Sequence, residues 1–360
     1  MKKSAQVFPS WISTTVSKLG DKKKTRKVES ISERDEGEAT TSQMVTAPEV
    51  TPGESFLKAP RIVFKGHLLP VRSVGVLVTP NPEDSLICSG GDDKLILVWS
   101  LKTGKKVAEL SGHAQRVICL STFQCAEAGS YVISGSWDER VRIWPLKDCF
   151  PLNSTPTTTS ETKENKEIIS LSERLSAQSI VLKGHTNRVF STTVVARPGE
   201  APFVASSSAD NTIRLWSLPD GHPLYVLEDD EDATWNLCIS SWFIADNGEC
   251  PYHGTVLISG CKNTTVRVWR HHSEEEVVKL AGRASVLGDA LKHAVDAMTG
   301  RPSATTVRTA PDLVISGHTS AVHALAPFSH HDQPFVVTAC KDLDLRVFSL
   351  LTGKHSCHLS

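Results

Sequence analysis

Serine, histidine and aspartate recur together along this chain, and together they could form a nucleophilic catalytic site. His113, Ser134 and Asp138 are one such set. In hydrolases of this kind the histidine takes the proton of the serine hydroxyl, and the aspartate orients the imidazole. An enzyme needs one such set in one cleft, whereas this chain has three complete sets and two degenerate ones. Repetition therefore favours a structural use, in which the side chains satisfy one another's buried polar groups. With no phosphate-binding loop or dinucleotide fingerprint elsewhere, the sequence predicts a protein that is not an enzyme and has no cofactor.

The sets lie in five segments of the chain that align without gaps. In each segment an Asp or Asn stands six residues before a closing aromatic residue, and a Ser or Thr stands four residues before that Asp or Asn. A Gly-His pair precedes four of the segments. Short β-branched runs separated by Gly, Pro, Asn or acidic turns fill the space between these marks, which is typical of successive antiparallel strands. The five segments are Ser89 to Trp99, Ser134 to Trp144, Ser206 to Trp216, Ser259 to Trp269 and Thr338 to Phe348.

With Gly-His near its start and an aromatic residue near its end, each unit resembles the WD40 repeat. The resemblance covers residues 61–360 and implies an all-β fold, a WD40-type β-propeller of four-stranded antiparallel blades, within residues 59–360. It places five recognisable repeats at about 61–104, 105–147, 178–220, 221–272 and 312–353. It also implies structural tetrads of His, Ser, Asp and Trp: His67, Ser89, Asp93 and Trp99; His113, Ser134, Asp138 and Trp144; His185, Ser206, Asp210 and Trp216.

Two repeats depart from the pattern. The fourth lacks Gly-His and has Asn263 for Asp, and the fifth has Phe348 for Trp, so we expect these two blades to be less tightly tied. Two insertions interrupt the period. Residues 148–177 are rich in Ser and Thr and predict a mobile polar loop between the third and fourth strands of a blade. Residues 273–311 contain a helical pattern, and two segments compete for the outer strand beside them, one near Gly282 and one at 311–318. Either a helical insert splits the fourth blade, which we favour, or a shrunken sixth repeat lies between Arg283 and Gly317.

The two ends of the repeated region raise the question of completeness. A strand at Arg61 to His67 would close the last blade of a WD40 propeller, yet Lys354 to Ser360 already supplies an outer strand there. Three explanations are open: a truncated chain, a closed propeller with a degenerate blade, or an open propeller completed by a partner's strands.

Residues 1–58 differ in composition from the repeats. Eight Lys or Arg stand against one Asp in residues 1–28, and seven acids against one Arg in residues 29–57. Such a segment buries too little apolar surface to offset the entropy of ordering, which predicts a disordered tail. Its basic run, Lys22 to Lys27, could be a nuclear-import signal, a nucleic-acid contact or simply a solvated surface.

Charge and cysteine content set further bounds. The formal net charge is −1, and the nine cysteines have no paired spacing, which is typical of reduced thiols in a cytoplasmic or nuclear protein. Neither a signal peptide nor a membrane span is predicted. Cys250, His253 and Cys261 could imitate a metal site, but their spacing is poor, so no metal is expected.

The function that these features favour is a scaffold that binds other proteins. The resemblance implies that the loops bearing Gly-His and the tetrad Asp share one face. Arg116, Trp137 and Arg188 occupy it with residue types enriched in binding hot spots, and the acid run from Glu228 would complement a basic peptide. Alternative roles are a substrate receptor of a ubiquitin ligase, suggested by a misplaced "WDER" at Trp137, or a nucleic-acid factor acting through the tail. The candidate binding residues are Arg116, Trp137, Arg188, Glu228, Asp229, Asp230 and Lys341.

Overall fold

The structure is a computed structural model that describes most of the repeated region. The described residues are 63–78, 85–125, 129–146, 161–196, 201–218, 220–228, 234–244, 254–270, 305–308, 311–331 and 333–359. From Phe64 onward they belong to one compact unit. The predictions for residues 1–58 lie outside the described residues. Within the described part, no helix is long and apolar enough to cross a membrane.

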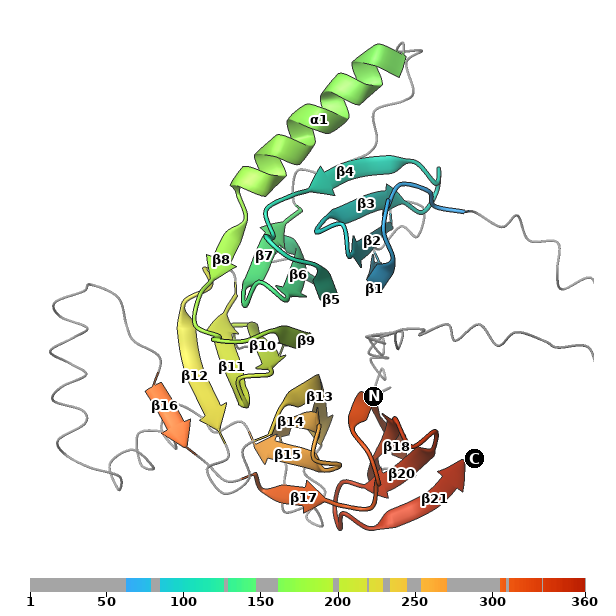
Figure 1. The fold of residues 1–360 in the computed structure, drawn as a ribbon, viewed down its shortest axis with the longest axis vertical. Helices are drawn as coiled ribbons and strands as arrows, with labels where there is room; N and C mark the ends of the chain where they lie inside the picture. The colour runs from blue at the N-terminus through green and yellow to red at the C-terminus, as the bar shows by residue number, and fades with distance from the viewer. Residues whose placement is uncertain are drawn as a thin grey trace, which may run out of the picture. The chain divides into compact units, whose positions relative to one another are not determined.

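Five β-sheets follow one another along the chain, each built on four antiparallel strands as the repeats predict, and the third sheet has one additional parallel strand (Figure 1). We call them blades 1 to 5. Blade 1 contains β1 (Val71–Leu77), β2 (Leu86–Gly91), β3 (Ile96–Ser100) and β4 (Lys106–Leu110). Blade 2 contains β5 (Val117–Cys125), β6 (Gly129–Ser136), β7 (Val141–Pro145) and β8 (Ile180–Leu182). Blade 3 contains β9 (Val189–Val195), β10 (Phe203–Ser208), β11 (Thr212–Ser217) and β12 (Pro223–Glu228). Blade 4 contains β13 (Asn236–Ile244), β14 (Gly254–Cys261), β15 (Val266–Arg270) and β17 (Leu313–Ile315), and blade 5 contains β18 (Val322–His330), β19 (Gln333–Cys340), β20 (Leu345–Ser349) and β21 (His355–Leu359).

At three of the four junctions between consecutive blades, a valine on the first strand of one blade meets a glycine on the second strand of the blade before it. Val117 of β5 is fully buried, and a Cβ atom added at Gly90 of β2 would lie 2.7 Å from its Cγ1. Such close approach explains the glycine after the tetrad serine in β2, β6 and β14, because a larger residue there would push the neighbouring blade away. The same contact joins Gly135 to Val189 and Gly260 to Val322.

Blades 1 and 5 expose apolar side chains whose equivalents in other blades are buried. Val71 of β1 occupies the position of Val117, yet it is 43% exposed, and Val74 and Val76 on the same strand are 46% and 42% exposed. In blade 5, Leu345 is 42% exposed, although its equivalents in the other blades are buried. Blades 1 and 5 therefore each have an apolar side without a cover in the described part of the chain.

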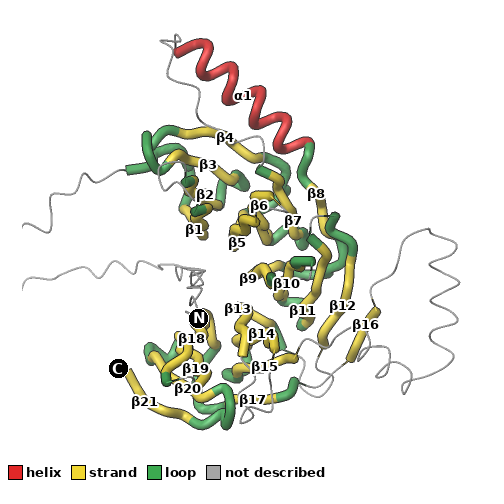
Figure 2. Tube along the Cα trace, turned by 180° about the vertical axis from the view of Figure 1, so that it is seen from behind, coloured by secondary structure: helices red, strands yellow, loops and turns green. Residues whose placement is uncertain are grey.

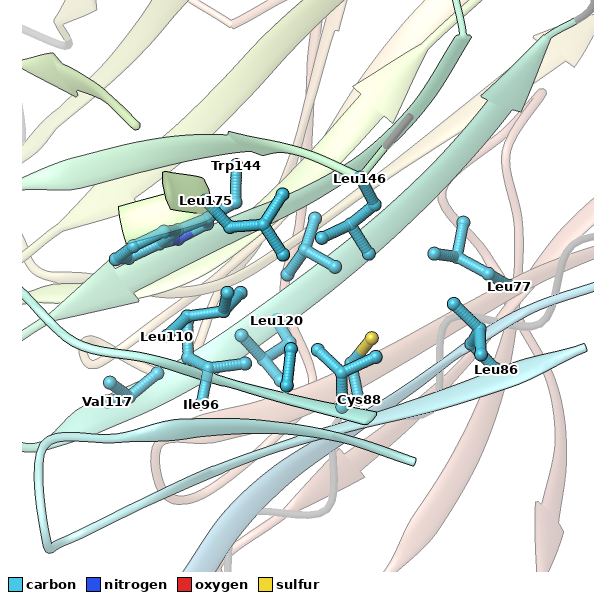
Figure 3. Close-up of a cluster of buried hydrophobic side chains, with 13 residues drawn as sticks. Leu77, Leu86, Cys88, Ile96, Leu110, Val117, Leu120, Trp144, Leu146 and Leu175 are labelled. Atoms are coloured by element: carbon cyan, nitrogen blue, oxygen red, sulfur yellow. The ribbon is translucent and has the colours of Figure 1, made fainter. Parts of the chain in front are cut away.

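The first insertion contains a helix, so the prediction of a polar loop over 148–177 is wrong for residues 161–177. α1 (Glu161–Ala177) packs along β4 of blade 1 (Figures 1 and 2). Leu175 is fully buried in the core cluster that Figure 3 shows, beside Trp144 and Leu146. The sequence did not predict this helix because its apolar residues are few and the segment before it is rich in Pro and Thr.

Two serines fix α1 to the free edge of β4. The backbone N–H of Glu109 donates to Ser172 Oγ at 2.9 Å, and that of Ser111 donates to Ser176 Oγ at 3.0 Å. Alternate N–H groups of a strand are about 6.7 Å apart and residues four apart on a helix are about 6 Å apart along its axis, so the two repeats match. The helix thus covers a strand edge that would otherwise be open to pairing.

The second insertion separates the third and fourth strands of blade 4, and the helix predicted within it lies outside the described residues. Leu313–Ile315 (β17) pairs with β15 and is the outer strand, whereas the competing segment near Gly282 lies outside the described residues. A short strand before it, β16 (Thr305–Arg308), pairs in parallel with β12 of blade 3. The chain start gives a further correction: residues 63–67 form no strand, and Phe64 packs instead on Trp99 with ring centres 5.6 Å apart. The outer strand of blade 5 is β21, as its sequence predicts.

Candidate functional site

Each complete tetrad is a chain of hydrogen bonds that runs from a tryptophan to an aspartate. In blade 2, Trp144 Nε1 lies 2.8 Å from Ser134 Oγ, which lies 2.7 Å from His113 Nε2, and His113 Nδ1 lies 2.8 Å from Asp138 Oδ2. An indole N–H can only donate and a carboxylate can only accept, so with a neutral imidazole the proton sits on Nδ1, and Nε2 accepts from the serine hydroxyl, which itself accepts from the indole. The Nδ1–H then donates to the carboxylate. Blades 1 and 3 repeat this geometry with Trp99, Ser89, His67 and Asp93, and with Trp216, Ser206, His185 and Asp210.

This arrangement leaves the serine no part in catalysis. Ser134 and Ser206 are fully buried, and their hydroxyls are already used in both directions. The carboxylates also hold the turns: Asp138 accepts from the backbone N–H of Ala114 at 2.8 Å and of Arg140 at 3.0 Å. The tetrads are therefore braces between the loop that enters each blade and the turn between its second and third strands.

Burial and hydrogen bonding set the charges within the tetrads. Burial alone would raise the pKa of Asp138, but the bonds from His113 and the two backbone N–H groups outweigh it and lower the pKa. The pKa of Asp210 is lowered in the same way. Burial lowers the pKa of His185 and outweighs the hydrogen bond to Asp210 that would raise it. At neutral pH the imidazole of His185 is thus neutral and the carboxylate of Asp210 is charged.

In blade 5 the donor and acceptor roles of the hydroxyl and the histidine are exchanged, because Phe348 has no N–H group to donate. Thr338 Oγ1 donates instead to the carbonyl of Arg346 at 3.2 Å and accepts from His318 Nε2 at 2.6 Å. His318 Nδ1 then carries no proton and accepts from Arg346 Nη1 at 2.8 Å. The same Nη1 donates to Asp342 at 3.0 Å, while His318 Nδ1 and Asp342 are 3.3 Å apart. A buried arginine thus replaces the missing indole donor.

Blade 4 has the weakest version. Trp269 Nε1 still donates to Ser259 Oγ at 3.1 Å, but no histidine joins the pair in the described part of the blade. Asn263 Oδ1 accepts from the backbone N–H and the hydroxyl of Thr265, both within its own turn. Ser259 Oγ lies 3.9 Å from Cys261 Sγ, which lies 3.5 Å from Asn236 Oδ1 on the first strand, so a thiol and an amide stand where the other blades have histidine.

One group of side chains has the makings of a metal site. His318, Cys340 and Asp342 place one donor atom each within 4.8 Å of one another. Arg346 Nη1 already lies among them, at hydrogen-bond distance from the first and the third. A metal ion would have to displace this guanidinium, so the group is better described as a polar network. Of the three residues considered from sequence, Cys250 and His253 lie outside the described residues, and Cys261 is a buried thiol that donates to Asn236 Oδ1 at 3.5 Å. Burial raises the pKa of the free thiol Cys119 to about 12, which keeps it unreactive.

The candidate binding face is organised by a second repeated contact. In every blade the residue before the tetrad acid donates its backbone N–H to the carbonyl of the residue that precedes the first strand. The turn between the second and third strands is thereby joined to the loop that enters the blade. The two predicted series of positions are neighbours in space as a result, in the pairs Asp92 and Pro70, Trp137 and Arg116, Ala209 and Arg188, Lys262 and Trp235, and Lys341 and Ala321.

Arg116, Trp137 and Arg188 come together on this face as one stack. Arg116 Cζ lies 4.3 Å from the centre of the Trp137 ring, and Arg188 Cζ, from the next blade, lies 4.1 Å from the same centre. Such distances are those of favourable cation–π contacts. Arg188 is exposed, while Arg116 and Trp137 are half-buried. The Trp137 Nε1 atom is shielded from solvent and has no hydrogen-bond partner among the described residues.

The stack has neighbours on both sides. In blade 1, Arg72 Nε donates to Asp92 Oδ1 at 2.7 Å, and Arg116 Nη1 lies 3.7 Å from the other oxygen of that carboxylate. In blade 4, Lys262 Nζ lies 3.8 Å from the centre of the Trp235 ring. Sequence reasoning missed this second cation–aromatic pair because the blade lacks the Gly-His from which the positions were counted. Counting back from Asn263 would have found Lys262.

The remaining candidate residues are more scattered. Lys341 is exposed on the same face of blade 5. Glu228 is half-buried at the end of β12, on the same side of blade 3. Asp229 and Asp230 lie outside the described residues, so the acidic patch predicted for a basic peptide is represented by Glu228 alone.

Comparison with known proteins agrees with this architecture. The model of the family described as "WD domain, G-beta repeat" matches residues 58–100, 104–145, 176–217 and 310–349. Cell division control protein 4 of Candida albicans is 26% identical over 307 residues, which are 68% of this chain and 41% of that protein. Mitochondrial division protein 1 of Eremothecium gossypii is 26% identical over 213 residues, 56% of this chain and 26% of that protein. WD repeat-containing protein 41 of Homo sapiens is 32% identical over 105 residues, 27% of this chain and 22% of that protein.

The chain thus spans less than half the length of each of these relatives. The family model omits blade 4, the blade whose tetrad is the least complete. The four matched segments, with their hydrogen-bonded tetrads and four-stranded sheets, show that the chain belongs to the WD40-repeat family.

Proposed function

We propose that this chain is a non-enzymatic scaffold of the cytoplasm or nucleus that binds partner proteins on the face made by Arg116, Trp137 and Arg188. The observation that carries the proposal is the stack of two guanidinium groups on one indole. None of these three side chains takes part in a tetrad. Their contact with one another therefore does not contribute to the hydrogen bonds that hold the blades together.

The stack has the properties of a binding hot spot. Tryptophan and arginine are the residue types that lose most affinity on truncation in protein interfaces. Both guanidinium groups are already held against the ring, so less side-chain entropy is lost when a partner binds. The fold contributes rigidity, because Trp137 and Arg116 are joined by a backbone hydrogen bond of 3.2 Å.

The alternative roles have less support. The "WDER" sequence that suggested a ubiquitin-ligase receptor lies in the turn between β6 and β7, where Trp137 belongs to the stack and Asp138 to a tetrad. The nucleic-acid role rests on the basic run Lys22 to Lys27, which lies outside the described residues.

The proposal is tested by comparing the proteins that variants capture from a cell extract. The double variant Arg116→Ala, Arg188→Ala should lose at least about tenfold of each captured partner by quantitative mass spectrometry, as two hot-spot truncations imply. Lys354→Ala, on the turn between β20 and β21 at the opposite end of its blade, is the matched control. Equal capture by the unchanged chain, the double variant and Lys354→Ala would show that partners bind elsewhere, for example on the insertions.

A further inference from the structure

We propose that this face takes an acidic peptide segment, whose anionic group is held between Arg116 and Arg188 at the edge of Trp137. The inference rests on the proposed scaffold function and adds the chemistry of the partner. A carboxylate and a phosphoryl group share that chemistry, and the experiment below separates them.

The two guanidinium groups lie close to one another, each in contact with the Trp137 ring. Both Cζ atoms lie within 4.3 Å of one ring centre, so they are no more than twice that distance apart. Stacking uses the flat face of a guanidinium and leaves its N–H edge free for a planar acceptor. One anionic side chain can therefore reach both groups.

The stack lacks a strong anionic partner of its own. No ion pair of Arg188 occurs among the described residues, and Arg116 reaches Asp92 only at 3.7 Å. Asp92 is already bound by Arg72, and the hydrogen bond from that arginine is the main cause of its lowered pKa. A partner's anion would complete the coordination that the chain leaves open.

The face presents further charges to solvent. Lys262 and Lys341 continue the row on blades 4 and 5, and both are exposed. The tetrad acids nearby are also ionised, but they are buried and saturated with hydrogen bonds, as Asp138 illustrates. Glu139, half-buried on the turn of Trp137, reduces the local positive charge by one. Glu228 at the end of β12 removes one further positive charge. Among the described residues the cations of this face still outnumber these two acids, which favours an acidic partner over a basic one.

The same arrangement argues against a basic ligand. An indole ring can bind a lysine or methyl-lysine only through an uncovered face, and two guanidinium groups already lie over Trp137. The basic peptide expected from the acid run near Glu228 would meet these cations first.

Fluorescence anisotropy with labelled peptides tests the proposal on the full chain. The probes are short peptides of one length with a common Gly-Ser backbone, which carry Glu, phosphoserine, Lys or Ser at the same positions. We expect the Glu peptide, the phosphoserine peptide or both to bind, and the Lys and Ser peptides to bind at least about tenfold more weakly. Arg116→Glu and Arg188→Glu should each weaken acidic binding by about tenfold or more, because a charge-assisted hydrogen bond is lost. Lys354→Glu makes the same charge change at the opposite end of a blade and should change affinity by less than about twofold.

The outcomes separate the inference from the proposed function. Binding of the Glu peptide alone identifies carboxylates as the ligand, and binding of the phosphoserine peptide alone identifies phosphoryl groups. Equal or tighter binding of the Lys or Ser peptide, or acidic binding that survives both charge reversals, overturns the inference. If no acidic peptide binds, but the double variant Arg116→Ala, Arg188→Ala still loses the partners captured from extract, the proposed binding face is supported and the proposed acidic ligand is rejected.

Discussion

Removal of the carboxylate of Asp138 tests whether the tetrads brace the blades. We expect Asp138→Ala to lower the free energy of unfolding by about 3 kcal/mol, and Asn263→Ala, at the equivalent position of blade 4, to lower it by about 1 kcal/mol or less. The comparison is matched, because both changes remove a short polar side chain from the same turn of a repeat.

The magnitude follows from the three hydrogen bonds that Asp138 accepts. His113 is buried, so its Nδ1–H would have no partner after the change, which costs about 1–3 kcal/mol. The N–H groups of Ala114 and Arg140 are not buried, so water can replace the carboxylate there at a smaller cost of about 0.5 kcal/mol each. The bonds of Asn263 to Thr265 stay within one turn, and their loss leaves no buried imidazole unsatisfied.

Urea unfolding followed by tryptophan fluorescence gives the midpoints, and hydrogen exchange locates the damage. Because repeat proteins can unfold in more than one step, the amides of Ala114 and Arg140 provide the local readout and should lose protection in Asp138→Ala. A loss of stability in Asn263→Ala as large as that in Asp138→Ala would refute the assignment of a blade-spanning brace to the complete tetrad.

Two further predictions follow from the packing and from the buried histidines. Leu175→Ala should lower the free energy of unfolding by about 2–5 kcal/mol and speed hydrogen exchange in β4. Ile169→Ala, at a residue that is 57% exposed, should do neither. Equal effects of the two changes would mean that α1 does not pack on blade 1. Acidification should also destabilise the protein, because burial lowers the folded-state pKa of His185 and His318, so below about pH 6.5 the unfolded chain binds protons that the folded chain does not. The loss on going from pH 7.5 to 5.5 is at most about 1.4 kcal/mol for each imidazole, and urea midpoints that do not change over this range would contradict it.

The repeated sheets could be predicted from sequence because the signal is local and occurs five times. Each Ser or Thr of a second strand, each Asp or Asn in the following turn and each closing aromatic residue marks the same place in a blade. Counting from these marks also located Arg116, Trp137 and Arg188, since equivalent positions of adjacent repeats must lie side by side. A period is enough to infer which residues are neighbours.

What the sequence could not reveal depends on contacts between distant segments. The few apolar residues of α1 predict no helix by themselves, because the helix is stabilised by the core beside Trp144 and by the edge of β4. The loss of a tryptophan at Phe348 suggested a weak blade, whereas Arg346 supplies the missing donor by reaching across the turn. The pairing of β16 with β12 joins Thr305 to Tyr225, and no periodicity within either segment indicates it.

The two insertions also bear on how the blades unfold. α1 lies in the sequence between β7 and β8 of blade 2 and packs on blade 1, and β16 lies between β15 and β17 of blade 4 and pairs with blade 3. Each insertion thus leaves from the same point of a blade and reaches back to the outer strand of the blade before it. In a linear array the stability is a sum of terms for single repeats and for nearest neighbours, and these contacts enlarge the neighbour term for blades 1 and 2 and for blades 3 and 4. Partial opening of the described blades should therefore begin where no insertion reaches back, between blades 2 and 3 or between blades 4 and 5, and parting blades 4 and 5 would expose the apolar cluster that they share.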